Sequence, residues 1–368
     1  MADGDGKVRR EVEEASQAPQ RASEGAEEMD QHQTSEQLIE QFLAETGGTV
    51  SQTGASTDTA GVPSWEEEPL PEGHRSGFVA LIGRPNVGKS TLVNALVGKK
   101  VTIVSSKPQT TRNRIRGILT APEYQMIFID TPGIHERPLR RLNKLMIQEA
   151  VDAIPDADVI LFVVDVSVKP RREDRLIAEL LQEKARHRPV IFALNKMDRL
   201  PVEHARELIE AYWAILPEHA DSIPVSALKG TNVTLLRDHI LQFVPEGPRY
   251  YPGDQVTDQT ERQIAAELIR EALFRYTREE VPHSVAVLVE EFKQRKSGTL
   301  YVAATIWVER DSQKAIVIGK RGERLKQIGV VARGELERFI GGRVFLDLWV
   351  KVKPDWRDHA ARLRELGY

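Results

Sequence analysis

The stretch FVALIGRPNVGKSTLVNAL, residues 78–96, decides the fold of this chain. Its first five residues are apolar and predict a buried strand, and its last six predict a helix. Between them, Gly-x4-Gly-Lys-Ser has the spacing of a phosphate-binding loop. Gly83 and Gly88 let the backbone wrap closely around a phosphate, and the amides at the start of the helix then face the anion. The stretch therefore predicts an α/β domain that binds a nucleoside triphosphate.

Two side chains of this loop carry specific chemistry. Lys89 is expected to reach the β- and γ-phosphates, and the Ser90 hydroxyl is expected to ligate Mg²⁺. A second motif, Asp-Thr-Pro-Gly at residues 130–133, follows another apolar strand. A carboxylate at a strand end can hold Mg²⁺ through water, and the Gly133 amide can sense the γ-phosphate. The two motifs together predict a magnesium–triphosphate site but do not indicate the base.

The motif Asn-Lys-Met-Asp at residues 195–198 indicates the base. The Asp198 carboxylate can accept hydrogen bonds from both N1–H and N2–H of guanine, a pair of donors that adenine lacks. Asn195 can tie this segment to the phosphate-binding loop, and the stem of Lys196 can cover the face of the base. The motif therefore favours guanine nucleotides.

A fourth motif, Ser-Ala-Leu-Lys at residues 226–229, follows a further short strand, and its Ala227 amide is expected to donate to guanine O6. All four motifs lie at the carboxyl ends of predicted strands, which is where open α/β sheets bind ligands. The predicted nucleotide-binding residues are Gly83, Arg84, Pro85, Asn86, Val87, Gly88, Lys89, Ser90, Thr91, Asp130, Thr131, Pro132, Gly133, Ile134, Asn195, Lys196, Met197, Asp198, Ser226, Ala227 and Leu228.

Residues 74–244 alternate short apolar runs with amphipathic segments, a pattern typical of a doubly wound, mostly parallel sheet. A run with two prolines and a glycine, residues 245–248, cannot continue a helix and marks a boundary. Residues 249–368 are predicted to form a smaller α+β domain. The predicted strands are 78–82, 126–129, 159–164, 190–194, 223–225, 285–289, 300–308 and 344–352, and the predicted helices are 172–185, 202–215, 258–277 and 322–340.

The second domain contains a Gly-Lys-Arg-Gly loop before an amphipathic helix. A Gly-x-x-Gly loop between two helices lets about four nucleotides of single-stranded backbone approach closely, and its basic side chains fit phosphate contacts. The motif alone is usually a simple turn, so its setting between strands and a helix carries the prediction. Trp307, Trp349 and Trp356 are expected in the core or at its rim. The predicted RNA-binding residues are Gly319, Lys320, Arg321, Gly322, Arg324 and Lys326.

Charge and composition narrow the class of protein. Residues 1–73 carry 17 acidic and 4 basic side chains, whereas residues 74–368 carry 38 acidic and 47 basic ones. The acidic segment has too little apolar surface to offset chain entropy and is predicted to be disordered, while the basic body favours an anionic partner. The absence of cysteine excludes a disulfide framework, a thiolate zinc site and a cysteine nucleophile. No apolar run approaches the ~18 residues that span a bilayer, and no secretory signal is predicted.

The motifs resemble those of the Era-like GTPases, a ribosome-assembly group within the translation-factor-class P-loop GTPases. The resemblance is carried by GRPNVGKST and DTPG in the first domain. In the second domain, residues 280–285, 309–314 and 351–356 are similar to the type II KH domain of that group. The resemblance implies a GTPase domain over 74–248 and a type II KH domain over 249–368. The acidic extension, residues 1–73, departs from the compact family core.

The same resemblance implies a function. The chain would be a switch that binds and hydrolyses GTP, binds the small-subunit (16S-type) ribosomal RNA near its 3′ end and assists assembly of the 30S subunit. Its ligands would be GTP or GDP with Mg²⁺, and no DNA partner is expected. Its location would be the bacterial cytoplasm, with loose, peripheral association with the inner membrane.

The segment Gln-Thr-Thr-Arg at residues 109–112 resembles the first switch of the group, in which a threonine completes the Mg²⁺ shell. Thr111 is favoured over Thr110 for this role. The predicted Mg²⁺ ligands are therefore Ser90, Thr111 and Asp130. The residues predicted to be catalytic are Lys89, Thr111 and Gly133.

Ile134 occupies the position after Asp-x-x-Gly where many GTPases have a glutamine that orients the attacking water. Isoleucine can neither orient water nor accept a proton, so a slow intrinsic rate is expected. Asn86 resembles the asparagine that ties a bound K⁺ in relatives, and a K⁺ ion beside the β- and γ-phosphates could assist. His135 is read as a mobile switch residue rather than a general base.

Two alternatives to the GTP-driven switch remain at this level. The first is an RNA adaptor whose nucleotide is structural and never turned over, which Ile134 keeps open. The second is a peripheral membrane protein. Multiple-turnover GTP hydrolysis separates the switch from the adaptor, and fractionation after a salt wash tests the membrane alternative.

Overall fold

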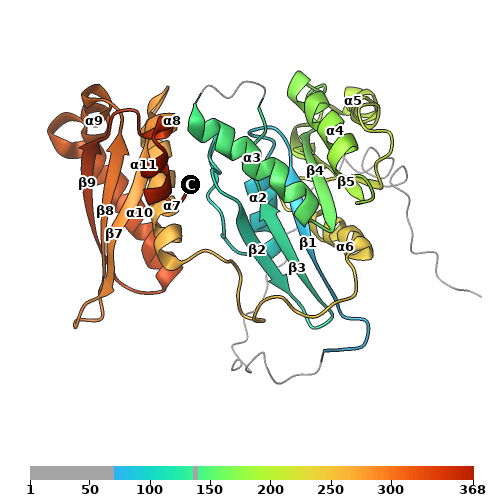
Figure 1. The fold of residues 1–368 in the computed structure, drawn as a ribbon, viewed down its shortest axis with the longest axis horizontal. Coiled ribbons are helices and arrows are strands. Elements are labelled where there is room, and N and C mark those ends of the chain that lie inside the picture. The colour runs from blue at the N-terminus through green and yellow to red at the C-terminus, as the bar shows by residue number, and fades with distance from the viewer. Residues whose placement is uncertain (1–69, 136–139) are drawn as a thin grey trace, which may run out of the picture.

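The computed structural model describes residues 70–135 and 140–368 and arranges them in two domains (Figure 1). The segment predicted to be disordered, residues 1–73, lies outside the described residues except for its last four. The first domain is built on a six-stranded sheet and the second on a three-stranded sheet. This architecture confirms the predicted fold class, an α/β domain followed by a smaller α+β domain.

The first sheet has the strand order β2-β3-β1-β4-β5-β6. Its neighbouring strands are parallel except for β2, which pairs antiparallel with β3 at one edge. After β1 the chain forms β2 and β3 on one side of this strand and then β4, β5 and β6 on its other side. The loop after β1 therefore lies at the point where the strand order reverses, which is where open α/β sheets bind ligands. The strands are β1 (Arg75–Ile82), β2 (Ile115–Thr120), β3 (Tyr124–Asp130), β4 (Val159–Asp165), β5 (Val190–Asn195) and β6 (Asp221–Pro224).

Helices cover both faces of this sheet. One face carries α3 (Arg141–Asp156), α4 (Arg172–Lys184) and α5 (Ala205–Trp213), and the other carries α2 (Lys89–Val97) and α6 (Val233–Phe243). Every residue of β4 is buried. A strand buried on both faces reads as a continuous apolar run, which explains why this strand was readily predicted.

Sequence patterns do not indicate β2, α3 or α6. In the edge strand β2, Arg116 and Gly117 interrupt the apolar residues, so neither a continuous run nor a strict alternation marks the strand. Gly117 is required by packing, because a Cβ there would lie 2.9 Å from side-chain atoms of Val93 and Val97 in α2.

The segment after the predicted boundary continues along the first domain. The amides of Tyr250 and Tyr251 donate to Gln125 Oε1 at 2.8 and 2.9 Å. The Ile118 amide donates to the Val256 carbonyl at 2.9 Å. These contacts hold the connecting segment against β2 and β3 before the second domain begins, and the division at 248/249 stays a prediction.

The second domain has the sheet order β7-β8-β9, with β7 antiparallel and β9 parallel to β8. Helices α7 and α10 pack on one face of this sheet around an apolar cluster. Strands β8 and β9 have the predicted limits. The elements are α7 (Glu261–Tyr276), α8 (Val281–Ser284), β7 (Ala286–Gln294), β8 (Leu300–Val308), α9 (Asp311–Ile318), α10 (Glu323–Ile340), β9 (Val344–Val352) and α11 (Ala360–Glu365).

The two domains are in direct contact. Leu142 and Met146 of α3 join a buried apolar cluster with Trp307, Trp356 and Leu363 of the second domain. In Figure 1, α3 accordingly runs toward α11 at the end of the chain. Over residues 70–135 and 140–368, no helix has the length and apolar character needed to cross a membrane.

Candidate functional site

The phosphate-binding loop joins β1 to α2 and depends on two glycines. A Cβ on Gly83 would lie 2.3 Å from the Val163 carbonyl oxygen, so no other residue fits beside β4. Gly88 has φ 101°, and a Cβ there would lie 2.4 Å from Asn195 Nδ2. The loop therefore has its sharp path because glycine alone satisfies both its backbone angles and its neighbours.

Lys89 lies buried at the start of α2. Its Nζ donates to the carbonyls of Gly83 at 2.8 Å and Arg84 at 3.1 Å. Burial lowers the pKa of Lys89 to about 8, with the charge of Arg84 acting in the same direction and that of Asp130 opposing it. A phosphate anion placed beside this ammonium group would favour its charged form.

Three hydroxyls converge on one carboxylate oxygen at the end of β3. Ser90 Oγ, Thr111 Oγ1 and Thr102 Oγ1 donate to Asp130 Oδ2 at 2.7, 3.2 and 3.0 Å, respectively. Ser90 Oγ also lies 2.8 Å from Thr111 Oγ1. Thr110 Oγ1 instead donates to the Lys107 carbonyl. The structure thus brings Thr111, rather than Thr110, to the predicted magnesium site.

These oxygens fit a magnesium ion. The second carboxylate oxygen, Asp130 Oδ1, is buried without a hydrogen-bond partner in the described residues. Burial raises the pKa of Asp130, although the Ser90 hydroxyl and the Lys89 charge act in the opposite direction. A hard cation bound by hydroxyl and carboxylate oxygens would offset this buried charge, and Mg²⁺ typically uses one or two carboxylates together with substrate phosphates. The donor set therefore suits Mg²⁺.

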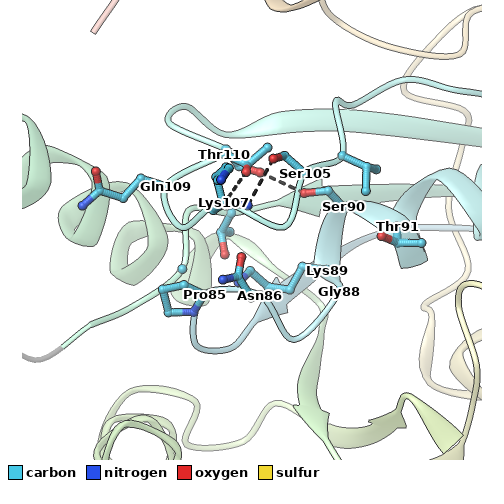
Figure 2. Close-up of a pocket in the computed structure, with 14 residues that line it drawn as sticks. Pro85, Asn86, Gly88, Lys89, Ser90, Thr91, Ser105, Lys107, Gln109 and Thr110 are labelled. Atoms are coloured by element: carbon cyan, nitrogen blue, oxygen red, sulfur yellow. Dashed lines mark hydrogen bonds between the residues drawn. The ribbon is translucent and has the colours of Figure 1, made fainter. Parts of the chain in front are cut away.

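The first switch and the residues directly before it line a cavity of about 60 Å³ together with the phosphate-binding loop (Figure 2). Figure 2 labels Pro85, Asn86 and Lys89 of the loop, Ser105 and Lys107, which precede the switch, and Gln109 of the switch, whose side chain points away from the loop. The motifs do not point to Val104, Ser105 and Lys107. Their only sequence signal is their place between the phosphate-binding loop and the switch threonines.

The segment that contains the Asp-Thr-Pro-Gly motif, residues 130–133, lies directly against the phosphate-binding loop. A Cβ on Gly133 would lie 2.6 Å from the Pro85 nitrogen, so the two backbones approach as closely as glycine permits. Ile134 is only 9% exposed and belongs to the apolar core on the α3, α4 and α5 side of the sheet. Its amide donates to the Gly83 carbonyl at 3.3 Å. The side chain after Asp-x-x-Gly therefore packs in the core, where it takes no part in orienting water.

The expected guanine-binding segments are tied to each other and to the phosphate-binding loop. Asn195 Nδ2 donates to the Val87 carbonyl at 2.7 Å, and Asn195 Oδ1 accepts from the Ala227 amide at 3.0 Å. Ser226 Oγ donates to Asp198 Oδ1 at 2.6 Å. The Ala227 amide is expected to donate to guanine O6. To do so, it must either share its hydrogen between guanine O6 and Asn195 Oδ1 or release Asn195 Oδ1.

Not every predicted nucleotide-binding side chain points toward the cavity. Arg84 is only 7% exposed, and its Nε donates to Asp174 of α4 at 3.1 Å. Lys196 Nζ forms an ion pair with Asp165 at 2.6 Å. Val87 is fully buried in the core. The side chains of Arg84 and Val87 hold the loop in place, whereas the ion pair of Lys196 engages only its Nζ and leaves the role of its stem a prediction.

The Gly-x-x-Gly loop between α9 and α10 has an unusual backbone. Gly319, Arg321 and Gly322 all have positive φ, at 74°, 52° and 79°. Lys320 and Arg321 are exposed, as is Lys326 one helical turn later. Arg324 instead donates to the Ile316 carbonyl at the end of α9 at 2.6 Å. The loop therefore presents two basic side chains to solvent, while Arg324 binds a backbone carbonyl at the C-terminal end of α9.

A groove of about 450 Å³ runs from this loop between α10 and β9. Its floor and walls are mostly apolar, and Val330 is 54% exposed. Among the predicted RNA-binding residues, only Gly322 and Lys326 line it. The lining residues that the motif does not indicate are Leu325, Gly329, Val330, Arg333, Val344, Phe345, Leu346 and Leu348. The signal that the sequence offered for this groove was a glycine, Gly329, next to the apolar Val330 within the predicted helix 322–340.

Comparisons with known proteins match one segment of each domain to a family. Residues 78–196 match the family described as 50S ribosome-binding GTPase, and residues 280–357 match the KH domain family. The chain is 51% identical to GTPase Era of Geotalea uraniireducens (strain Rf4) over 294 residues, which is 80% of this chain and 98% of the relative. It is 47% identical to GTPase Era of Clostridium botulinum (strain Kyoto / Type A2) with the same coverage.

Two solved structures are also similar to this chain. The first is Era in complex with MgGDPNP and nucleotides 1506–1542 of 16S ribosomal RNA, with 43% identity and a TM-score of 0.76. The second is an Aquifex aeolicus Era variant bound to GDP·AlF4⁻, with the same identity and TM-score. Each comparison covers 80% of this chain and 99% of the solved chain.

Proposed function

The chain belongs to the Era family of GTPases, and from that premise we propose that it uses GTP binding and hydrolysis to control binding of the 3′ end of small-subunit ribosomal RNA. It is a GTP-hydrolysing enzyme with a KH domain, and its ligands are GTP, GDP and Mg²⁺. The observation that carries the proposal is the convergence of Ser90 and Thr111 on Asp130 beside Lys89.

In this proposal, Lys89 and the loop amides bind the β- and γ-phosphates. Ser90, Thr111 and Asp130 hold Mg²⁺, which neutralises charge on the phosphate oxygens. The Gly133 amide reports the γ-phosphate, and Asp198, held by Ser226, selects guanine. The chemistry of each group and its position in the structure support these roles.

Slow intrinsic hydrolysis is expected, because Ile134 packs in the apolar core and offers no group that could orient the attacking water. Asn86 lines the phosphate cavity with φ 64° and supports the proposal that a K⁺ ion assists there. Multiple-turnover phosphate release, measured in K⁺ and in Na⁺, tests this role. We expect faster turnover in K⁺, and equal rates in both salts would contradict the role of Asn86.

The first switch is connected to the KH domain directly after Thr111. The next residue, Arg112, is only 3% exposed, donates to the Val285 carbonyl at 2.9 Å, and lies 5.5 Å from the Trp356 ring centre. From the KH side, Arg270 donates to the Thr110 carbonyl at 2.5 Å. A change in the position of Thr111 therefore acts on residues that anchor the KH domain, which supports a switch rather than two independent domains.

RNA is proposed to bind at the Gly-x-x-Gly loop and along the groove between α10 and β9. Lys320 and Arg321 would contact phosphates, and the apolar groove would receive bases. Charge reversal at both positions, Lys320→Asp with Arg321→Asp, is expected to abolish RNA retention in a filter assay. GTP affinity should be unchanged, because both residues are exposed on a loop of the second domain. Unaltered RNA retention would show that the loop is only a turn.

The proposal has two further parts. The chain assists assembly of the small subunit, and it associates with the surface of the inner membrane. Co-sedimentation with 30S subunits in the presence of MgGDPNP tests the first, with the Lys320→Asp/Arg321→Asp variant as control. Retention of the chain in a membrane fraction after a salt wash tests the second.

A further inference from the structure

The outer face of the KH sheet, on the side away from α7 and α10, carries an aromatic and basic surface. Even-numbered residues of β8, such as Val302 and Ile306, pack into the core. Because side chains alternate along a strand, Tyr301 points to the other face together with its register partners, Phe345 of β9 and Lys293 of β7. Trp349 lies four residues beyond Phe345 on the same face of β9.

These aromatic side chains are not core residues. Trp349 is 60% exposed and Phe345 is 50% exposed, whereas Trp307 and Trp356 are buried. The expectation that Trp349 lies in the core or at its rim is therefore wrong. Large exposed aromatic side chains on one face of a small domain mark a binding surface rather than a packing requirement.

Cations lie against the aromatic rings near Tyr301, while Asp347 lies between Phe345 and Trp349 on the same face of β9. The guanidinium carbon of Arg295 lies 4.3 Å from the ring centre of Tyr301 and 4.8 Å from that of Phe345. Lys293 lies 5.4 Å from the Tyr301 ring and also pairs with Glu291. Rings for stacking, combined with cations for the backbone, are the features that bind single-stranded nucleic acid with little sequence preference.

Phe345 also lines the groove between α10 and β9. β9 is an edge strand, so one side of it faces the groove while the other belongs to the outer face. We infer that single-stranded RNA leaving the groove passes around this edge and stacks bases on Phe345 and Trp349, with Arg295 beside its phosphates. This inference rests on the proposed RNA function of the groove and extends its footprint.

The test uses the full chain with MgGDPNP and two fluorescein-labelled RNAs from the 16S 3′ segment. One has about six nucleotides and fills the groove alone, and the other extends it to about 14 nucleotides. Wild-type protein is expected to bind the longer RNA more tightly. Trp349→Ala is expected to weaken the longer RNA about tenfold and to leave the shorter one unchanged.

Matched variants separate stacking from general damage. Trp349→Phe should retain most of the affinity for the longer RNA, and Trp349→Leu, which is apolar but has no ring, should lose it. Phe339→Ala removes another exposed aromatic side chain of the same domain, on α10, and should change neither affinity. Arg295→Ala should weaken only the longer RNA, whereas Lys184→Ala on the first domain should change neither.

The outcomes distinguish this inference from the function on which it rests. Failure of the wild-type chain to bind the shorter RNA would overturn the proposed groove. Binding of the shorter RNA with no gain from the extension, or an equal effect of Trp349→Ala on both RNAs, would overturn the outer face alone. A wild-type dimer that Trp349→Ala converts to a monomer would show instead that this face binds a second copy of the chain.

Discussion

Asp130 accepts three hydroxyl hydrogen bonds at one carboxylate oxygen, and two of the donors are predicted magnesium ligands. Thr111 and Thr110 are neighbours, yet only Thr111 reaches this group. Thr111→Ala should therefore slow single-turnover GTP hydrolysis at least tenfold, or about 1.4 kcal/mol in activation free energy. Thr110→Ala serves as the matched control and should change the rate much less. Equal effects of the two variants would contradict the assignment of Thr111.

The guanine-selecting role of Asp198 is testable by exchanging donor and acceptor groups. Asp198→Asn should weaken GTP binding by about 1.5–3 kcal/mol, since hydrogen bonds to a charged group are lost. It should also improve binding of xanthosine triphosphate, whose base offers an acceptor to the new amide. Calorimetric titration with both nucleotides measures the exchange, with Glu203→Gln as an exposed control. Full GTP affinity in the Asp198→Asn variant would refute the role.

At this scale the sequence predicts the motif residues because their chemistry permits few substitutes. Gly83, Gly88 and Gly133 each lie where a Cβ would collide with backbone or side-chain atoms. Ser105 and Lys107 could not be predicted, because a loop that lines a cavity can do so with many residue types. The partners of Arg84 and Lys196 also come from elements distant in the sequence, α4 and the end of β4.

At the scale of elements, the first switch is the segment on which the proposal depends. Arg112→Ala should reduce the difference between the RNA affinities measured with MgGDPNP and with MgGDP, because the link to Val285 and Trp356 is lost. Arg114 lies in the same segment but pairs with Glu149 and Asp156 of its own domain. Arg114→Ala should therefore leave the difference intact. An undiminished difference in Arg112→Ala would contradict the coupling.

The junction between this segment and α8 should also be sensitive to acid. Burial lowers the pKa of His283, and the charges of Arg112, Arg357 and Lys107 add to the effect. The folded state therefore binds fewer protons than the unfolded state, so stability is complete above the ordinary histidine pKa of about 6.5 and is lost as pH falls below it. Urea unfolding at pH 7.5 and 5.5 should show a larger loss for the wild-type chain than for His283→Gln. An equal loss in both would contradict this role of His283.

Strands with long apolar stretches were predictable, including the edge strand β9, whereas the edge strand β2 was not. β4 and β8 show continuous apolar runs, and the predicted limits of β8 agree with the structure. β2 is an edge strand with a polar residue and a glycine among its apolar ones. In the helix α9 the apolar residues do not gather on one side, and only Gln313 and Val317 are buried. Its sequence therefore does not show a clear helical stripe.

At the scale of the whole molecule, the two domains are connected by more than a linker. Leu142 and Met146 pack against Trp307 and Trp356, and Lys100 pairs with Glu271 at 2.6 Å. No local pattern indicates such contacts, because each depends on two segments that approach one another only in the folded chain. The sequence predicted two domains and a nucleotide–RNA function, whereas the contacts that allow one domain to act on the other required the structure.

The most direct test of the account measures the affinity of the full chain for nucleotides 1506–1542 of 16S ribosomal RNA under three conditions. These are saturating MgGDPNP, saturating MgGDP and the adenine analogue MgADPNP at the same concentration. The account predicts at least tenfold tighter RNA binding with MgGDPNP than with MgGDP, and no effect of MgADPNP beyond that of Mg²⁺ alone. Equal RNA affinity under all three conditions would contradict control of the KH domain by guanine nucleotide.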